Sequence, residues 1–375
     1  MGDPIPFPQR RPARHQPDDA AIAAALAEVA RRAPHADAGS EDLGPSLDAL
    51  RAAGLFRALA AYAEPAPGEQ VIDGIVTLLR RIGRANLSVG RLVEGHLNAH
   101  RLVALYGTTD QRASVDAAIA DGALLGVWGA DGAPPVSFDL QGDRLTLSGG
   151  KRFASGLGLV SPAVISVRTD AGPQLLLVPS RATERIDPTA WATTGMKATL
   201  SGTFDFDGMT VGADALLGQP GDYGREPHFE GGVWRYAALH VGGMEALAEA
   251  ARRHAVDGGF ADDPLAAARL ADLALACETG RLWVERAAFR VEAHGAGETD
   301  VAYVLLAREA VERACLTVIE TVDRLIGAAS FFEGLPVERI RRDLSFFLRQ
   351  ANLDGKRAKA ARSVAGSDAP VGDMW

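Results

Sequence analysis

The most informative segment of the chain reads Pro336-Val337-Glu338-Arg339-Ile340-Arg341-Arg342-Asp343-Leu344, and Ala351 follows eight residues after its aspartate. The segment lies in a region, 233–366, in which apolar residues recur at helical spacing. We expect the Arg-Arg-Asp triplet at 341–343 to form an ion pair that anchors the last helices. The alternative is that these arginines, together with Arg339, contact phosphate groups across a subunit interface.

Working outward from this segment, the 375 residues divide into three zones. Residues 18–119 and 233–366 show helical periodicity, whereas 122–218 contains short apolar and β-branched runs separated by Gly, Pro and Asp. No long helix intervenes between those runs, which favours antiparallel pairing. The predicted strands are Leu124–Trp128, Arg144–Leu147, Ala163–Arg168, Gln174–Val178 and Thr203–Phe206.

We therefore predict an α+β multidomain protein. An N-terminal helical domain, 1–120, would begin with a flexible arm at 1–17 and be followed by a middle antiparallel β-barrel domain at 121–226. A C-terminal helix bundle would occupy 227–366, and 367–375 would be a loose tail. Helices with long apolar stripes fit such a bundle.

Composition excludes several classes of protein. The formal net charge of −9 argues against a nucleic-acid or anionic-membrane partner, since both need a positive field. Two cysteines fit neither a disulfide scaffold nor a zinc site, and we predict no metal. The longest uncharged stretch, 153–167, is interrupted by Gly and Pro and is shorter than the roughly 20 apolar residues that span a bilayer. Because the N-terminus also lacks a signal peptide, we expect a soluble protein of the cytoplasm without membrane insertion.

Several short patches occur in an informative order. Besides 336–344, they are LRAAGLF at 50–56, GALLGVWGA at 122–130, LSGGKRFASG at 147–156, and GMKAT at 195–199 running into FDFDGMTV at 204–211. Together they resemble the acyl-CoA dehydrogenase superfamily, flavoenzymes that desaturate acyl thioesters. The resemblance covers most of the chain and implies a flavin held between the middle domain and the C-terminal bundle.

The resemblance also implies which residues contact the cofactor, expected to be FAD rather than FMN. Phe153 would pack on the isoalloxazine ring, and the Ser155 hydroxyl would hydrogen-bond near flavin N5 and O4, where it can tune the electron sink. Trp128, Gly129 and Ala130 would offer backbone polar groups and one ring to the pyrimidine edge.

A second set of cofactor contacts is implied across a subunit boundary. Gly327 and Ala328 fall at the Gly-rich turn that approaches the FAD of a neighbouring subunit, and Arg324 stands where Gln is usual. A monomer would leave part of the FAD in water, so the resemblance implies a homodimer or homotetramer.

The family's catalytic carboxylate is missing from both of its usual positions. A glutamate commonly removes the substrate α-proton there, whereas this chain has Ala351 and Trp234. The candidates for a relocated base are His228, Glu230 and Asp354, although solvated loop charges are the simpler interpretation. Arg235 begins a helix, where it would face a substrate carboxylate or phosphate, or else form a salt bridge. Arg235, Glu230 and Asp354 are therefore the catalytic candidates.

Two histidines are spaced for one helix face. His96 and His100 are four residues apart, with Glu94 nearby. A metal site would need a third ligand that the sequence does not supply. The remaining interpretations are a helix that lines the substrate cavity and simple packing. The predicted substrate-binding residues are thus His96, His100, Trp234 and Arg235.

Three functions remain open. The first is an FAD-dependent oxidoreductase that desaturates an acyl thioester such as an acyl-CoA. The second is a flavin monooxygenase of the same fold, which uses O2 and reduced flavin delivered by an electron-transfer or flavin-reductase partner. The Asp263-Pro264 pair resembles that branch. The third is a catalytically degenerate flavin-binding or scaffolding protein.

Overall fold

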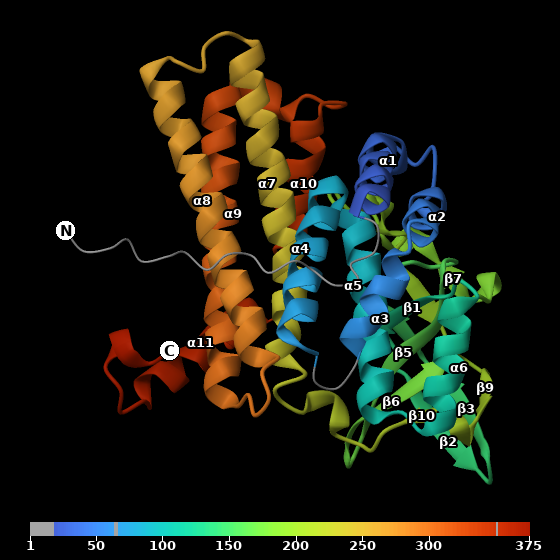
Figure 1. Ribbon diagram of the computed structural model, residues 1–375. Helices are drawn as coiled ribbons and strands as arrows, with labels where there is room; N and C mark the ends of the chain where they lie inside the picture. Colours follow the sequence, from blue (N-terminus) through green and yellow to red (C-terminus); the bar gives the residue numbers. More distant parts are fainter. Residues whose placement is uncertain (1–18, 64–66, 350–351) are drawn as a thin grey trace.

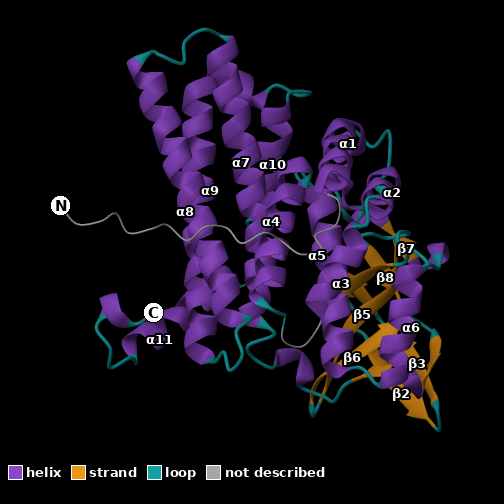
Figure 2. Ribbon diagram, viewed as in Figure 1, coloured by secondary structure: helices purple, strands orange, loops and turns teal. Residues whose placement is uncertain are grey.

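The computed structural model describes residues 19–63, 67–349 and 352–375. Its elements follow the predicted order of helices, strands and helices (Figure 1). The long C-terminal helices stand on one side of the molecule and the strands on the other, with α4 (Glu69–Ala85) and α5 (Leu87–Tyr106) between them (Figure 2). The predicted arm at 1–17 lies outside the described residues.

The N-terminal region is helical, as predicted. Besides α4 and α5 it contains α1 (Asp19–Asp37), α2 (Gly44–Ala52), α3 (Leu55–Ala63) and α6 (Thr109–Ala120). The start of α5 is fixed by Asn86, whose side-chain oxygen accepts hydrogen bonds from the backbone N–H groups of Ser88 (2.8 Å) and Val89 (3.3 Å). These bonds satisfy donors that have no partner within the helix. A capping box between Thr108 and Gln111 starts α6 in the same way.

The C-terminal region is a helix bundle, as predicted. It consists of α7 (Trp234–Asp257), α8 (Pro264–Val291), α9 (Glu298–Ile326), α10 (Pro336–Phe347) and α11 (Leu353–Ala365). The backbones of α4 and α7 approach closely at two glycines. A Cβ on Gly83 would lie 2.4 Å from the Leu239 carbonyl oxygen, and one on Gly242 would lie 2.1 Å from that of Arg80. Any larger residue would push the two helices apart, so the glycines set their separation.

The middle region forms three small sheets. The first has the order β1 (Leu124–Trp128), β5 (Val160–Thr169), β6 (Gly172–Val178) and β10 (Leu216–Leu217). The second joins β2 (Ser137–Gln141), β3 (Arg144–Ser148) and β9 (Thr210–Gly212). The third joins β4 (Gly150–Arg152), β8 (Thr203–Asp205) and β7 (Ile186–Asp187).

Strand pairing in these sheets is antiparallel with one exception. β1 runs parallel to β5, from the pair Leu124–Val160 to the pair Trp128–Ile165. This difference from the predicted all-antiparallel domain has a simple cause: β2, β3 and β4 intervene in sequence, and such a long connection lets the chain return in the same direction.

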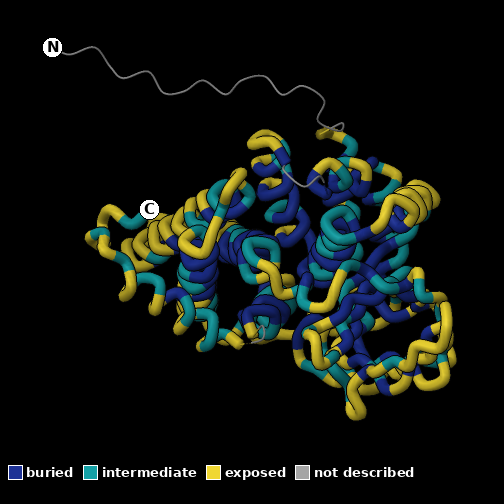
Figure 3. Tube along the Cα trace, turned by 90° about the horizontal axis from the view of Figure 1, so that it is seen from below, coloured by how far each residue is buried: buried dark blue, intermediate teal, exposed yellow. Residues whose placement is uncertain are grey.

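Buried residues from all three regions form a continuous core, and a smaller cluster lies between α5, α6 and the first sheet. Buried residues are dark blue in Figure 3. The C-terminal end differs from the loose tail predicted. The ring of Trp375 lies 5.5 Å from that of Tyr303 in edge-to-face contact, and its indole N–H donates to the Thr299 carbonyl oxygen at 3.4 Å. Among the described residues, no helix combines the length and the apolar character needed to cross a membrane.

Candidate functional site

An exposed aromatic ring stands at the end of β4. Phe153 has φ 54°, a left-handed backbone conformation that is unfavourable for a bulky residue, and it is 54% exposed. The neighbouring backbone is held by hydrogen bonds from Arg152 N to Ala130 O and from Ala154 N to Gly202 O, both 3.0 Å. Strain of this kind costs about 1–3 kcal/mol and persists only where the surroundings enforce it. The loop therefore presents the ring to its surroundings rather than to the core.

The Ser155 hydroxyl lies two residues further along this loop. It accepts a hydrogen bond from Ser201 Oγ at 3.0 Å, and Ser201 Oγ lies 2.8 Å from Thr199 Oγ1. The indole N–H of Trp128 donates to the Ser155 carbonyl oxygen at 3.1 Å. The structure thus brings Trp128 to the loop that carries Phe153 and Ser155, and the contact of these residues with a flavin stays a prediction.

The other predicted flavin contacts lie at the end of β1 and play a different part. The Trp128 ring is buried against Phe204 at 5.4 Å, so it belongs to the core and leaves only its backbone for a ligand. The Gly129 carbonyl oxygen accepts from Lys151 Nζ at 3.2 Å. A Cβ on Gly129 would lie 3.5 Å from the Tyr223 hydroxyl, which places Gly129 beside that phenol, whereas the Ala130 carbonyl oxygen accepts from the Arg152 backbone N–H.

Arg324, Gly327 and Ala328 lie at the far end of α9 and in the following 3₁₀ turn, Gly327–Phe331. The Arg324 guanidinium is exposed and pairs with Glu320 at 2.7 Å. Within the described residues, none of the three forms a hydrogen bond or ion pair with the Phe153 loop. Their contact with a flavin across a subunit boundary remains a prediction.

Two further aromatic rings extend the surface next to Phe153. The ring of Trp191 lies 6.0 Å from that of Phe153, and Phe346 of α10 lies 5.4 Å from Trp191, both in edge-to-face contact. Beside them is a cavity of about 360 Å³ lined by Thr194, Arg341, Arg342, Ser345 and Phe346. The aromatic surface therefore runs from the β region onto α10.

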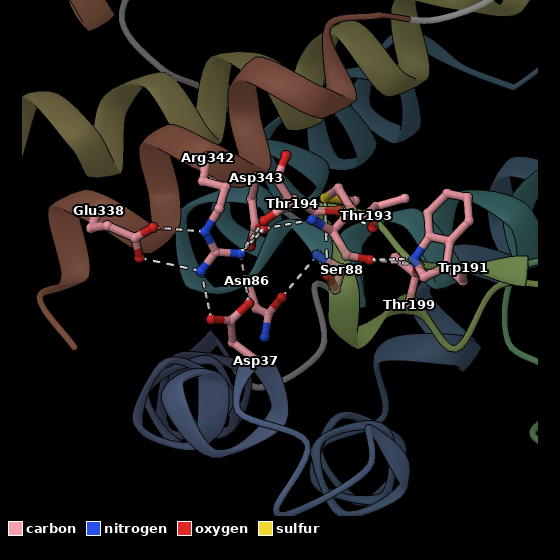
Figure 4. A network of polar contacts seen from close by, with 12 residues as sticks. Asp37, Asn86, Ser88, Trp191, Thr193, Thr194, Thr199, Glu338, Arg342 and Asp343 are labelled. Carbon is pink, nitrogen blue, oxygen red and sulfur yellow. Dashed lines mark hydrogen bonds and ion pairs between the residues drawn. The ribbon is translucent and has the colours of Figure 1, made fainter. Parts of the chain in front are cut away.

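A polar network fixes α10 against this surface (Figure 4). Arg342 pairs with Asp37 of α1 at 2.6 Å and with Glu338 at 2.8 Å, and it donates to the Thr194 carbonyl oxygen at 2.6 Å. The buried Asp343 carboxylate accepts from the backbone N–H of Met196 at 2.6 Å. Burial raises the pKa of Asp343 to about 6. The predicted ion pair of the 341–343 triplet thus connects α10 to α1 and to the loop after β7.

A second group of polar side chains comes from α5 and α7, where the Glu94 charge acts on Tyr236, whose ring lies 5.4 Å from that of His240. This α5–α7 polar cluster consists of Glu94, Asn98, Arg235, Tyr236 and His240. Four buried atoms in it have no hydrogen-bond partner among the described residues: Asn98 Oδ1, Arg235 Nε, the Tyr236 hydroxyl and His240 Nε2. Unpaired buried polar atoms are uncommon and call for an explanation such as a ligand or water.

Burial governs protonation in the α5–α7 polar cluster. It lowers the pKa of His240 to about 3, with the Arg308 charge acting in the same direction, so the imidazole is neutral near pH 7. Burial also raises the pKa of Tyr236, which therefore keeps its proton. The His240 ring packs edge-on against Phe347 at 4.6 Å. The cluster can thus offer one neutral imidazole and one phenol to a bound molecule.

Trp234 and one edge of Arg235 belong to an ion network around Glu292. Trp234 Nε1 donates to Glu292 Oε1 at 3.0 Å, and Arg235 Nη1 lies 3.4 Å from the same oxygen. Tyr62 also bonds this carboxylate, and Arg101 Nη2 lies 3.2 Å from its other oxygen. The buried indole of Trp234 is therefore a structural partner of Glu292.

The predicted catalytic carboxylates do not meet at the Phe153 loop. Glu230 pairs with Lys359 at 2.5 Å, and Asp354 is exposed in the first turn of α11. His228 is half-buried, and burial lowers its pKa. Ala351 lies outside the described residues. Among the described residues, none of these side chains bonds to Phe153 or Ser155.

His96 and His100 lie on the face of α5 opposite Glu94, because a step of two residues turns a helix by about 200°. His96 is buried, with Nδ1 accepting from the Leu125 backbone N–H at 3.1 Å, and His100 pairs with Asp116 at 3.0 Å. The four predicted substrate-binding residues therefore do not form one site. The described residues contain no group of three or more His, Cys, Asp or Glu side chains placed to hold a metal ion.

Tyr236 and His240 were not singled out in the sequence. Their spacing of four residues on one apolar helix is the only signal for them, and it is weak, because the same spacing is common among core residues. Their significance emerges only when α5 packs against α7 and leaves their polar atoms unpaired.

Comparisons with known proteins agree with this fold. Residues 233–347 match the family described as acyl-CoA dehydrogenase, C-terminal domain. The structure is similar to FMN-bound TdsC from Paenibacillus sp. A11-2, with a TM-score of 0.78 at 18% identity over 94% of this chain and 98% of that one. TdsC is a dibenzothiophene monooxygenase. No curated protein matches the sequence significantly.

Two further solved structures are comparably similar. Methanesulfinate monooxygenase MsuC from Pseudomonas fluorescens has a TM-score of 0.77 at 18% identity, over 95% of this chain and 98% of that one. KijD3 in complex with dTDP has a TM-score of 0.78 at 20% identity, over 93% and 96% of the two chains. The chain therefore has the acyl-CoA dehydrogenase fold. The predicted resemblance to the acyl-CoA dehydrogenase superfamily is confirmed.

Proposed function

We propose that this protein is a flavin-dependent monooxygenase that uses FMN, O2 and a small-molecule substrate. The observation that carries the proposal is the buried pairing of Trp234 with Glu292. The superfamily resemblance leads us to expect a catalytic glutamate at position 234. The Glu292 carboxylate, which Trp234 bonds, is already engaged by Tyr62 and two arginines as well. That carboxylate has little capacity to remove an α-proton, which disfavours acyl-thioester desaturation.

The Phe153 loop suits a flavin. An exposed ring in an enforced backbone conformation offers a stacking surface, and the Ser155 hydroxyl stands beside it as a hydrogen-bonding group. These two residues would hold the ring system. When bound and reduced, the flavin supplies two electrons to O2, so that one oxygen atom enters the substrate and the other leaves as water.

FMN is favoured over the FAD expected from the sequence because solved structures of this fold, TdsC and KijD3, contain FMN. In this proposal the electrons come from a separate flavin-reductase partner. The α5–α7 polar cluster binds the substrate. Tyr236 donates a hydrogen bond from its hydroxyl, and the neutral His240 holds a substrate proton at Nε2, since its other ring nitrogen interacts with the Phe347 backbone.

Oxygen uptake tests the proposal. The purified protein is mixed with FMN, NADH and a flavin reductase, and O2 consumption is recorded with indole or dibenzothiophene as probes, since TdsC binds indole and is named for dibenzothiophene. We expect one molecule of oxygenated product for each additional molecule of O2 that is consumed when the probe is present. His240→Gln should retain FMN yet lose product. A protein that takes up no flavin, or whose bound flavin is bleached anaerobically by acyl-CoA, would refute the proposal.

A further inference from the structure

A cavity of about 760 Å³ lies in the N-terminal region, away from the Phe153 loop. Its floor is the C-terminal half of α5, and its walls are α3 and α6. Phe56, Val103 and Ile119 contribute apolar surface. The volume falls within the range of about 300–1,000 Å³ found for small-molecule sites.

The lining of this cavity is positive although the whole chain carries −9. It contains three arginines, Arg51, Arg57 and Arg112, and one acidic residue, Asp116. Asp116 is engaged by His100 at 3.0 Å. A concave surface of one charge sign, with low-dielectric walls, attracts small ions of the opposite sign.

The three arginines differ in the hydrogen bonds and ion pairs that their guanidiniums already make. Arg51 pairs with Asp48, and Arg112 donates twice to the Gly107 carbonyl oxygen, at 3.0 and 2.7 Å. Arg57 makes no hydrogen bond or ion pair with any described residue. Its guanidinium lies over Gly54, with Nη2 3.1 Å from the position of a Cβ there. Arg57 is therefore the arginine best able to bind a ligand.

A buried donor stands behind the same wall. The His96 ring contacts Phe56 at 4.9 Å and His100 at 6.4 Å, both of which line the cavity. Its Nδ1 accepts a hydrogen bond, which leaves the proton on Nε2, and Nε2 has no partner among the described residues. A hydrogen-bond donor without a partner among the described residues therefore lies next to the cavity, at His96, as well as in its lining, at Arg57.

We propose that this cavity is a second binding site, which takes a small amphipathic organic anion. The carboxylate or phosphate head pairs with Arg57, with Arg51 and Arg112 supplying further positive charge, and the apolar body packs on Phe56, Val103 and Ile119. The site lies on the His100 face of α5, opposite the face that carries the α5–α7 polar cluster, so it does not depend on the proposed oxygenase activity.

Calorimetric titration of the purified protein tests this site with four probes. Decanoate and decyl phosphate carry an apolar body with different heads, whereas decanol lacks the charge and inorganic phosphate lacks the body. We expect one site that binds one or both of the amphipathic anions and neither of the other two. Arg57→Gln should weaken that binding by about tenfold or more, because a charge-assisted hydrogen bond is lost.

Matched variants identify the location. Arg253→Gln removes the same charge from an exposed position on α7, where Arg253 pairs only with Glu249 among the described residues, and should leave affinity unchanged. His240→Gln should also leave it unchanged, whereas Ala60→Trp should occupy part of the cavity and weaken binding. Oxygen uptake and thermal melting of Arg57→Gln should match the parent protein. Equal affinity in Arg57→Gln and Arg253→Gln, or no heat with either amphipathic anion, would overturn the proposal.

Discussion

The buried carboxylate of Asp343 accepts a hydrogen bond from the backbone N–H of Met196 at 2.6 Å, joining α10 to a loop 147 residues earlier in the chain. Met196 has φ 56°, so its peptide is held in a conformation that few non-glycine residues adopt. The same loop contributes Trp191, whose ring lies next to Phe153. The hydrogen bond therefore helps to position the aromatic surface proposed for the flavin.

Replacing Asp343 by Ala should lower the free energy of unfolding by about 1–3 kcal/mol, because the Met196 N–H would remain buried without an acceptor. Asp343→Asn keeps an acceptor oxygen and should cost less. Urea denaturation at pH 7 measures both. Asp262→Ala, an exposed aspartate on the turn before α8, is the matched control. If Asp343→Ala and Asp262→Ala have equal free energies of unfolding, the Asp343–Met196 hydrogen bond does not contribute to stability.

The two buried groups Asp343 and His240 should affect the pH dependence of stability in opposite directions. The folded-state pKa of His240 is about 3 against 6.5 when exposed, so the unfolded chain binds its proton first as pH falls. Stability from this group is fully present above about pH 6.5 and declines toward pH 3, with a slope of about 1.4 kcal/mol per pH unit. Asp343 has a raised pKa, about 6 against 3.8, so its contribution is present below about pH 4 and is lost as pH rises to 6.

Urea titrations between pH 5 and 7 test the histidine. His240→Gln should flatten the decline in unfolding free energy below pH 6.5 relative to the parent protein. His35→Gln, at an exposed position in α1, should not change the slope. An unchanged slope in His240→Gln would mean that folding does not lower the pKa of this imidazole.

The features that could be predicted are those whose signal lies within a few neighbouring residues of the sequence. The Phe153 loop was found because its residues are contiguous in a short patch, and the three-zone order followed from the change in periodicity between helices and strands. Strand β1 was predicted with its observed bounds, since Gly and Pro punctuate the chain on either side. In each case the signal and the structure lie within a few residues.

Contacts between distant helices were beyond such reasoning. His240 has no distinctive neighbours in sequence, and its role arises only where α7 meets α5 and α10. His96 and His100 were predicted to lie on a helix that lines the substrate cavity. Trp234 and Arg235 were grouped with them because Trp234 stands at a base position of the family and Arg235 begins a helix that could face a substrate anion. The orientation of α5 about its axis places His96 and His100 away from Trp234 and Arg235. Sequence alone does not show which face of a buried helix meets which partner.

The flavin site itself is tested at Phe153. Phe153→Ala should weaken FMN binding by roughly tenfold, because loss of a stacked ring costs on the order of 0.5–1.5 kcal/mol beyond its contact area. Fluorescence titration of FMN against the protein provides the dissociation constant. Phe260→Ala, between α7 and α8, removes a phenyl ring that packs on His254 and is the matched control. Equal FMN affinity in the two variants would place the flavin elsewhere.

The outer face of the C-terminal bundle bears on the predicted homo-oligomer. Leu275 and Leu282 of α8 are 67% and 53% exposed, and Leu265 and Leu316 are exposed on the same two-helix layer of α8 and α9. Leucines in such numbers on neighbouring helices exceed what a solvated face normally carries, and large exposed apolar patches mark protein–protein interfaces. We expect this face to be buried against a second copy of the chain.

Light scattering coupled to size exclusion measures the result. The parent protein should elute as a dimer or tetramer, and Leu275→Glu with Leu282→Glu should shift it to a smaller species, because two charges would be desolvated in the interface. Leu140→Glu on β2, where the leucine is 48% exposed, introduces one such charge on the opposite side of the molecule and should leave the oligomer intact. A double variant that keeps the parent mass would show that α8 does not form the subunit boundary, and Arg324, Gly327 and Ala328 would then need another route to a neighbouring flavin.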